Sequence, residues 1–421
     1  MLLTCLEILR SSCRFVPMKL WQKSSIRSFC RFFGLNISMV SLLIMVILVG
    51  LGEKMAERFL PLYLLAIGGT TFSVGFLNGL DNLLSALYSF PGGYVTEKIG
   101  TKKALILFTM IAMFGFSIVI IIPRWWAVLV GAIFFISWTA ISLPAIMSLV
   151  SSSLPKNKRT MGVSVHSFIR RIPMALGPVL GGVLIGNYGV RIGTRLSFAI
   201  ALLLGLVSII VVNRYIPDSS PEKKFPIRLQ RSIRFIKGDL KSLLVSDILI
   251  RFAEQIPYAF VVIWVVNHQG ITPLQFGILT TIEMAVAMII YLPIAVLADK
   301  TTKKPWVLIT FIHFTLFPLV LYFSRSFSAL VFAFILRGMK EFGEPTRKAL
   351  IMDLAPENAK AITFGTYYLI RDVIVSIAAF SSAFLWNISP GVNFFVAFLC
   401  GVIGTLYFVI NGKDSSAKIT I

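Results

Sequence analysis

The chain has 421 residues, of which 57% are hydrophobic and 14% charged, and its mean hydropathy is +0.86. A water-soluble domain of this length could not bury so much apolar surface, so the composition argues against an ordinary soluble enzyme or binding protein. Apolar segments of helix length recur from about Asn36 to Asn411, and a spanning helix needs about 20 such residues. We count twelve. Continuous apolar runs disfavour a β-barrel, whose strands are shorter and alternate in polarity, so we predict an all-α polytopic membrane protein.

The formal net charge is +22, but the basic residues lie in alternate loops and not on one face or in one domain. This distribution argues against nucleic acid as a partner. By the positive-inside rule it predicts a multi-pass protein of the inner (plasma) membrane with both termini in the cytoplasm. The basic clusters are the N-terminal tail from Arg10 to Arg31, then Lys98–Lys103, Lys156–Arg159, Arg214–Lys241 and Lys300–Lys304.

The cysteines and the N-terminal segment indicate neither a metal site nor a signal peptide. Cys5, Cys13, Cys30 and Cys400 have no CxxC or metal-like spacing, so we expect no metal and no other cofactor. Residues 1–35 lack the apolar core and cleavage site of a signal peptide. We interpret them as a basic cytoplasmic tail on anionic lipid, or in part as an over-extended start, since Met18 is an alternative initiator.

An internal repeat divides the chain into two halves. A shift of about 201 to 202 residues brings Gly75 onto Gly277, Asp81 onto Glu283 and Arg170 onto Arg371. Membrane-embedded acids rarely match acids by chance, so we predict two pseudo-symmetric six-helix bundles. The predicted parts are a basic tail (1–35), the first bundle (36–215), a cytoplasmic linker with an amphipathic helix (216–245), the second bundle (246–411) and a cytoplasmic tail (412–421). A disordered basic loop is the alternative for the linker.

A short loop motif follows the second and the eighth predicted spans. Residues 92–103 read GGYVTEKIGTKK and residues 295–305 read AVLADKTTKKP, each with an acid at a helix end and lysines that begin the next helix. The motif resembles the loop signature of the major facilitator superfamily. The matching positions are Gly93, Glu97, Lys98, Gly100, Lys102 and Lys103 in the first half, and Asp299, Lys300, Lys303 and Lys304 in the second.

The resemblance implies a gating role, in which the small residue permits close helix approach and the acid holds a contact that breaks when the cytoplasmic side opens. Simple topogenic charge is the alternative. The sequence departs from the pattern at Thr101 and Thr302, and about Ala132 stands where many proton-coupled members carry an arginine.

In the fifth span, GPVLGG is similar to part of a signature of the family's antiporters and favours efflux. Tight helix packing alone is the alternative for its small residues. The residues concerned are Gly177, Pro178, Gly181 and Gly182.

Ionisable residues inside spans cost about 2.5 to 3.5 kcal/mol each, so they are expected to face a cavity or to pair. Members of the superfamily line their cavity with spans 1, 4, 7 and 10, which implies roles for Glu57, Arg58, Arg251, Glu254, Arg337, Glu341 and Glu344. Our hypothesis is that Glu57, Glu254 or Glu341 exchanges a proton during transport. The remaining predicted cavity residues are Asp81, Arg170, Arg171, Glu283, Arg371 and Asp372.

Arg170 and Arg371 occupy equivalent places, and two arginines facing one cavity would suit an anion. The alternative is structural pairing, of Arg371 with Asp372 on a neighbouring span and of Arg170 or Arg171 with Asp81 or Glu283. Asp81 and Glu283 are themselves expected to be inter-helix latches more than ligands.

These features predict a monomeric secondary transporter in the lipid bilayer that moves a small-molecule substrate by alternating access. We expect it to be driven by a proton gradient, with efflux favoured and uptake of an organic anion or metabolite as the alternative. A membrane-embedded enzyme is disfavoured because the chain carries no HExxH, DxxDxxD, GxSxG or Walker sequence.

Overall fold

The computed structural model describes residues 37–136, 138–153, 159–218, 233–299, 302–356 and 360–414, and within these ranges it contains helices and no strand. The all-α prediction is confirmed. The predicted N-terminal tail, residues 219–232 of the linker and residues 415–421 lie outside the described residues, so the predictions for them stand as predictions.

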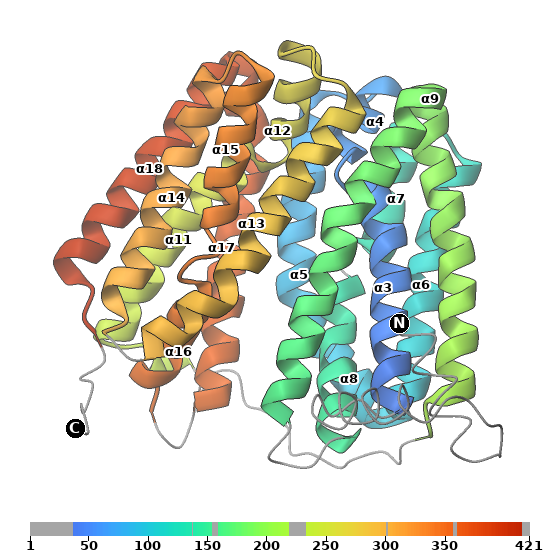
Figure 1. The fold of residues 1–421 in the computed structure, drawn as a ribbon, viewed down its shortest axis with the longest axis horizontal. Coiled ribbons are helices and arrows are strands. Elements are labelled where there is room, and N and C mark those ends of the chain that lie inside the picture. The colour runs from blue at the N-terminus through green and yellow to red at the C-terminus, as the bar shows by residue number, and fades with distance from the viewer. Residues whose placement is uncertain are drawn as a thin grey trace, which may run out of the picture.

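The first half is a bundle that begins with a broken helix (Figure 1). Gly189 has a φ of 75°, which side-chain-bearing residues rarely adopt, and it divides the long helix α9 into two limbs. The elements are α3 (Ile37–Glu57), α4 (Leu60–Ala66), α5 (Thr71–Ile99), α6 (Thr101–Ile121), α7 (Trp125–Phe135), α8 (Trp138–Ser153) and α9 (Arg159–Tyr215).

The second half repeats this order after a short 3-10 turn. Its first long helix, α11, is followed by a short helix and a π-helical turn, and the two parts are bent by 41°. The elements are η2 (Ile233–Phe235), α11 (Asp239–Tyr258), α12 (Phe260–Ile263), η3 (Trp264–His268), α13 (Pro273–Asp299), α14 (Lys304–Phe323), α15 (Phe327–Met339), α16 (Glu344–Leu354), α17 (Lys360–Ile388) and α18 (Pro390–Asn411).

Eight helices of the described chain are long and apolar enough to cross a membrane, or nine if the bent α11 to η3 pair is one span. Counting the two limbs of α9 separately, and adding α5 and the broken α15–α16 segment, would give the predicted twelve. The number twelve itself remains a prediction, because α5 and the α15–α16 segment are not among the helices that are long and apolar enough to cross a membrane.

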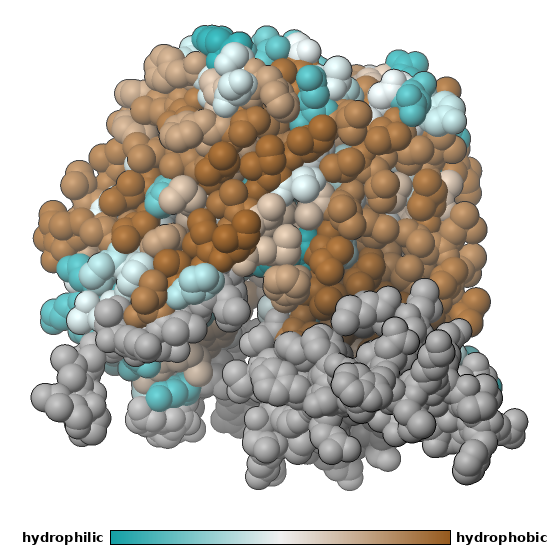
Figure 2. Space-filling view, in the orientation of Figure 1, coloured by the Kyte–Doolittle hydropathy of each residue, from teal (hydrophilic) through white to brown (hydrophobic). Residues whose placement is uncertain are grey.

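Apolar side chains cover the flanks of the molecule, while polar residues gather at its upper end (Figure 2). Large hydrophobic residues are freely exposed, for example Ile121 at 74%, Ile388 at 71% and Ile410 at 78%. Exposed apolar surface on this scale is stable in lipid and not in water. The chain is therefore a multi-pass membrane protein.

Two pairs of long helices join the halves, α5 with α17 and α9 with α13, and the short helices α4 and α12 also touch. A Cβ atom on Gly75 would lie 2.7 Å from the Cβ of Ala383, and one on Gly277 would lie 2.5 Å from the carbonyl oxygen of Pro178. The two glycines that the sequence repeat aligns thus perform the same task, each bringing its helix against the other half. The packing is pseudo-symmetric at the seam between the halves.

The contacts across this seam concentrate at one end of the molecule. Thr71 donates a hydrogen bond of 2.6 Å to Asn387, and Phe72 packs edge to face on Phe384 at 4.9 Å between centroids. Both contacts lie near the connection between α4 and α5, at the upper end in Figure 1, whereas the ribbons of the halves diverge toward the lower end. The helices α3 and α18 begin and end, respectively, at that lower end.

The small residues of the fifth span lie between α9 and its neighbours. A Cβ on Gly177 would lie 2.7 Å from that of Lys54, and one on Gly181 would lie 2.0 Å from the carbonyl oxygen of Met55. On Gly182 it would meet the carbonyl oxygen of Pro273 at 2.6 Å. These glycines bring α9 against α3 and against α13 of the other half.

The substitution Gly181→Ala is expected to lower the stability of the protein, because the added methyl group meets backbone atoms of α3 that cannot rotate away. Overpacking of this kind costs about 1–3 kcal/mol. Thermal unfolding in detergent measures the change. Gly186→Ala, on the same helix with no atom within 4 Å of its added Cβ, is the control and should be neutral or slightly stabilising. Equal effects of the two substitutions would contradict the packing described.

Candidate functional site

Four spans are interrupted part-way along their length, and residues beside the interruptions meet between the halves. Two have an evident backbone cause: Pro61 cannot donate to the carbonyl of Glu57, and Pro257 cannot donate to that of Ala253. Broken helices at this depth leave polar backbone groups free, and such groups are tolerated only beside protein or a water-filled cavity. The interruptions lie between α3 and α4, between α7 and α8, between α11 and α12, and between α15 and α16.

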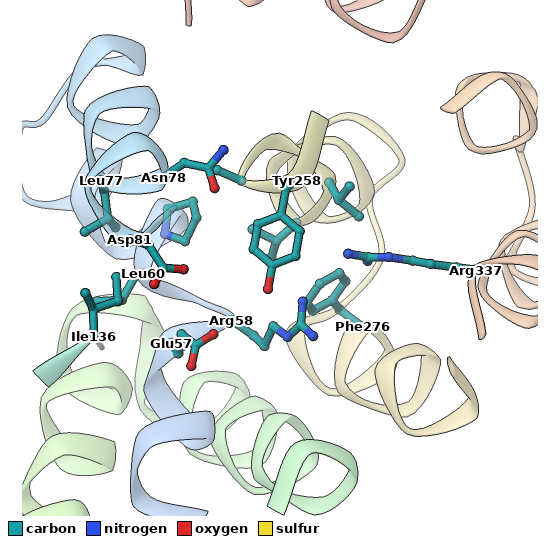
Figure 3. Close-up of a pocket in the computed structure, with 14 residues that line it drawn as sticks. Glu57, Arg58, Leu60, Leu77, Asn78, Asp81, Ile136, Tyr258, Phe276 and Arg337 are labelled. Atoms are coloured by element: carbon teal, nitrogen blue, oxygen red, sulfur yellow. The ribbon is translucent and has the colours of Figure 1, made fainter. Parts of the chain in front are cut away.

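A pocket with an empty volume of about 500 Å³, part of it open to solvent, lies where these interruptions meet (Figure 3). We call it the Tyr258 pocket. Its walls come from both halves and include residues at or beside all four interruptions. They are Glu57, Arg58, Leu60, Pro61, Leu77, Asn78, Asp81, Ile136, Tyr258, Ala259, Val261, Val262, Phe276 and Arg337.

Charges in the Tyr258 pocket are segregated. The carboxylates of Glu57 and Asp81 point into it from the first half, and the guanidinium groups of Arg58 and Arg337 approach the Tyr258 ring (Figure 3). The guanidinium carbon of Arg58 lies 5.3 Å from the ring centroid and that of Arg337 lies 5.6 Å from it. Both distances suit cation–π attraction. One side of the pocket is anionic and the other cationic.

Only some of these charges are paired. Arg337 lies 3.3 Å from the carboxylate of Glu283, and Glu57 accepts a hydrogen bond from Lys54. Arg58 and Asp81 differ, because neither forms an ion pair with any residue in the described part of the chain. The carboxylate of Asp81 accepts one long hydrogen bond, of 3.4 Å, from Ser85. The pocket therefore offers one guanidinium and one carboxylate that form no close ion pair with a described side chain.

Below the pocket, Glu53, Lys54 and Glu57 form a cluster that we call the Lys54 triad. The ammonium of Lys54 lies 3.3 Å from Glu53 and donates to Glu57. The side chain of Glu53 is only 3% exposed, and its second oxygen has no hydrogen-bond partner among the described atoms. Glu53 and Lys54 were not among the predicted site residues, although two acids four positions apart on one helix face were the available signal.

In the second half, buried charges form a continuous chain of ion pairs. Lys340 lies 2.8 Å from Glu254 and 3.4 Å from Glu283, and Arg251 pairs with Glu254 and lies 3.9 Å from Glu344. The structure thus brings together most of the predicted cavity residues of α11, α13 and α15–α16. They neutralise one another, and apart from Arg337 they lie outside the lining of the Tyr258 pocket.

The chain of ion pairs ends in a group that sequence reasoning missed. Asp247 is fully buried and pairs with Arg347, which is 1% exposed; it also lies 3.3 Å from Arg371 and accepts a hydrogen bond of 3.1 Å from Tyr367. We call these residues the Asp247 cluster. A lone acid within the apolar run LLVSDILI was the signal.

The predicted pair of anion-binding arginines is not assembled in the structure. Arg371 is buried in the Asp247 cluster and also lies 2.7 Å from Asp372, the next residue on its own helix and not one on a neighbouring span. Arg170 is exposed. Arg171 lies 2.8 Å from Glu341 of the other half, in place of the predicted partners Asp81 and Glu283. Structural pairing, one of the two readings of Arg371, is what its contacts support.

The loop motif lies at the lower end of Figure 1. The close helix approach falls at Gly92, whose added Cβ would lie 2.2 Å from the carbonyl oxygen of Ile141, and not at Gly93, which has space. Glu97 is exposed and makes no ion pair with the described residues, so its gating contact stays a prediction.

Lysines of the motif have acidic partners in both halves. Lys102 lies 3.7 Å from Asp218, and Lys303 pairs with Asp353 of α16. The backbone N–H groups of Lys303 and Lys304 donate to Asp414 at 3.0 Å. Gly100 caps the turn with a φ of 85°. Of the remaining motif positions, Lys98 and Lys103 are exposed. Lys300 and the side chain of Asp299 lie outside the described residues.

The family model described as Major Facilitator Superfamily matches residues 42–253 and 243–420, which is nearly the whole of the helical region. The chain belongs to the major facilitator superfamily. An uncharacterised MFS-type transporter of Methanocaldococcus jannaschii is 22% identical over 368 residues, covering 85% of this chain and 90% of that protein. The resemblance seen in the loop motif is thereby confirmed.

Solved structures of other transporters share this fold. A bacterial homolog of the human lysosomal transporter Spinster, in an inward-facing and unoccupied conformation, aligns with a TM-score of 0.68 at 14% identity, covering 89% of this chain and 95% of that one. A peptide transporter POT in complex with sulfate aligns with a TM-score of 0.73 at 14% identity, covering 89% and 93%. Fold and relatives indicate a superfamily transporter and not an enzyme.

The described residues contain no group of three or more His, Cys, Asp or Glu that could hold a metal ion. The Tyr258 pocket itself offers charged, hydrogen-bonding and apolar side chains.

The substitution Asp247→Asn is expected to destabilise the protein by about 3–5 kcal/mol, because it leaves Arg347 and Arg371 buried with less counter-charge. Thermal or denaturant unfolding in detergent measures the loss. Asp372→Asn provides a matched comparison: it removes another carboxylate beside Arg371, but one that is 25% exposed, and should cost much less. If Asp247→Asn were as mild as Asp372→Asn, the cluster would not contribute as described.

Proposed function

We propose that the chain is a proton-coupled secondary transporter that carries a small solute through the Tyr258 pocket by alternating access. The observation that carries the proposal is the position of the pocket: it lies between the two halves, where four interrupted spans meet, and two of its charged residues form no close ion pair with the described residues. Substrate sites between the halves near the membrane midplane are typical of secondary transporters.

The distribution of contacts between the halves supports an inward-open state. They concentrate at the end that carries Thr71 and Asn387, whereas the lysine-rich loops with Lys102 and Lys303 lie at the opposite end. Lysine-rich loops face the cytoplasm under the positive-inside rule. We therefore propose that the protein lies in the inner membrane with its termini in the cytoplasm, works as a monomer, and closes the lysine-rich end as the other opens.

The Lys54 triad is the proposed proton site. It holds two carboxylates and one ammonium, so one buried negative charge is left over, and a single proton would neutralise it. The ion-pair chain of the second half has no such excess, because six cationic residues face five acids there. The cations are Arg251, Arg337, Lys340, Arg347, Lys348 and Arg371, and the acids are Asp247, Glu254, Glu283, Glu344 and Asp372.

Among the three acids of the original hypothesis, this favours Glu57. Glu254 already has two cationic partners and Glu341 pairs with Arg171, whereas Glu57 shares one lysine with a second acid and also lines the pocket. A proton on the triad would release Lys54 from one carboxylate. Helix α9 packs on Lys54 and Met55 through Gly177 and Gly181 and also contacts the other half. Movement of Lys54 would therefore alter the packing of α9 against α3.

Export is the proposed direction, supported by the GPVLGG segment of the fifth span. Uptake of an organic anion is the second candidate, and it is favoured by one observation: the guanidinium groups of Arg58 and Arg337 both lie on the Tyr258 ring. Measuring solute flux in both directions across oriented membranes distinguishes export from uptake.

The experiment uses proteoliposomes that contain a pH-sensitive dye and a panel of anionic, cationic and zwitterionic solutes. At least one solute should move protons, and a pH gradient should drive its accumulation. Glu53→Gln and Glu57→Gln should lower gradient-driven accumulation by at least roughly tenfold while exchange of labelled for unlabelled solute continues.

Asp239→Asn, at the exposed start of α11, is the control and should transport as the unaltered protein does. Solute flux that ignores the pH gradient would overturn proton coupling. Unchanged proton coupling in both glutamine variants would show that the proton site is not in the Lys54 triad.

A further inference from the structure

The Tyr258 pocket carries two charges of opposite sign that have no ionic partner among the described residues, Arg58 and Asp81. Arg58 comes from the interruption between α3 and α4, and Asp81 from α5. Both lie in the first half and both face the same cavity (Figure 3). An ionised group within the membrane is costly unless it pairs or is hydrated, so each of them has reason to accept a counter-ion from a ligand.

The guanidinium of Arg58 is held in a form that suits a carboxylate. It lies over the Tyr258 ring at 5.3 Å from the centroid, an arrangement that fixes one face of the guanidinium and leaves the N–H groups on its edge to donate. Bidentate donation to a carboxylate is the interaction for which arginine is best shaped. No described carboxylate takes this place.

Asp81 offers a binding group of the opposite charge. Its carboxylate accepts only the 3.4 Å hydrogen bond from Ser85, so most of its acceptor capacity is free for an ammonium group. Much of the remaining pocket lining is apolar, with Leu77, Ile136 and Phe276 among its residues. A guanidinium and a carboxylate in one largely apolar pocket are complementary to a molecule with separated opposite charges and an aliphatic part.

We propose that the Tyr258 pocket selects zwitterionic solutes, with an acidic group on Arg58, an ammonium on Asp81 and an aliphatic spacer against the apolar wall. The inference rests on the proposed function, since it names the substrate class of the same pocket. The lining residues carry two guanidiniums and two carboxylates, so a zwitterion leaves the formal charge of the pocket unchanged. A simple anion would leave Asp81 without a partner, and a simple cation would leave Arg58 without one.

The test compares three probes of the same length, 6-aminohexanoate, hexanoate and hexylamine, by equilibrium binding to the purified full-length protein. Binding of 6-aminohexanoate, or of its shorter and longer homologues 4-aminobutyrate and 8-aminooctanoate, should be at least roughly tenfold tighter than that of the singly charged analogues. One spacer length should bind best, because the distance between the two charged groups is fixed by the fold.

Charge variants show which residue binds which end of the ligand. Asp81→Asn should reduce binding of the best ω-amino acid to the level of the matching carboxylate, while Asp81→Glu, which keeps the charge, should retain the preference. Arg58→Gln should reduce it to the level of the matching amine. Asp239→Asn should behave as the unaltered protein does.

Equal binding of hexanoate and 6-aminohexanoate, no binding of any ω-amino acid, or an unchanged preference in both Asp81→Asn and Arg58→Gln would each overturn the proposal. These results are distinct from failure of the proposed function. If the protein moves another solute with protons in proteoliposomes, transport through the pocket stands and only the zwitterionic class is wrong.

Discussion

Charged side chains inside a membrane need a partner or water, and this constraint organises the whole molecule. In the second half the need is met internally, by the ion pairs that run from Glu283 to the Asp247 cluster. In the first half it is met only in part, since Arg58 and Asp81 face the Tyr258 pocket without ionic partners among the described residues. A bundle with a satisfied interior therefore lies against one whose interior is left open to a ligand.

The two halves differ in how their charges are paired, but they pack against each other in the same way. Gly75 and Gly277, which the sequence repeat aligns, both bring a helix of their own half against the other. Interrupted spans then place Arg58, Ile136 and Tyr258 around one cavity. The same seam that holds the halves together at one end leaves room between them where the helices break. Such an arrangement can change which end is closed without repacking either bundle.

The sequence was sufficient for the fold because the signals there are strong: long apolar runs, alternating basic loops and a repeat that pairs Asp81 with Glu283. The site was harder to predict. Intramembrane charge identified the residues, but partner choice depends on helix rotation. The alternative that paired Arg170 or Arg171 with Asp81 or Glu283 did not anticipate the pair of Arg171 with Glu341. Asp247 escaped notice because one acid in an apolar run gives no hint of its partners. The close helix approach predicted at Gly93 occurs at Gly92. Neighbouring positions on a helix point about 100° apart, so an error of one residue changes which helix a position faces.

The most direct test of the central claim is the accessibility of the Tyr258 pocket from each side of the membrane. A cysteine at Ile136, in a cysteine-free background, would be treated with membrane-impermeant thiol reagents from either side of oriented vesicles while a pH gradient is imposed in each direction. Alternating access predicts labelling from both sides, with the favoured side reversed by the gradient. Labelling from one side alone under every condition would contradict it, because the pocket would then be a fixed vestibule.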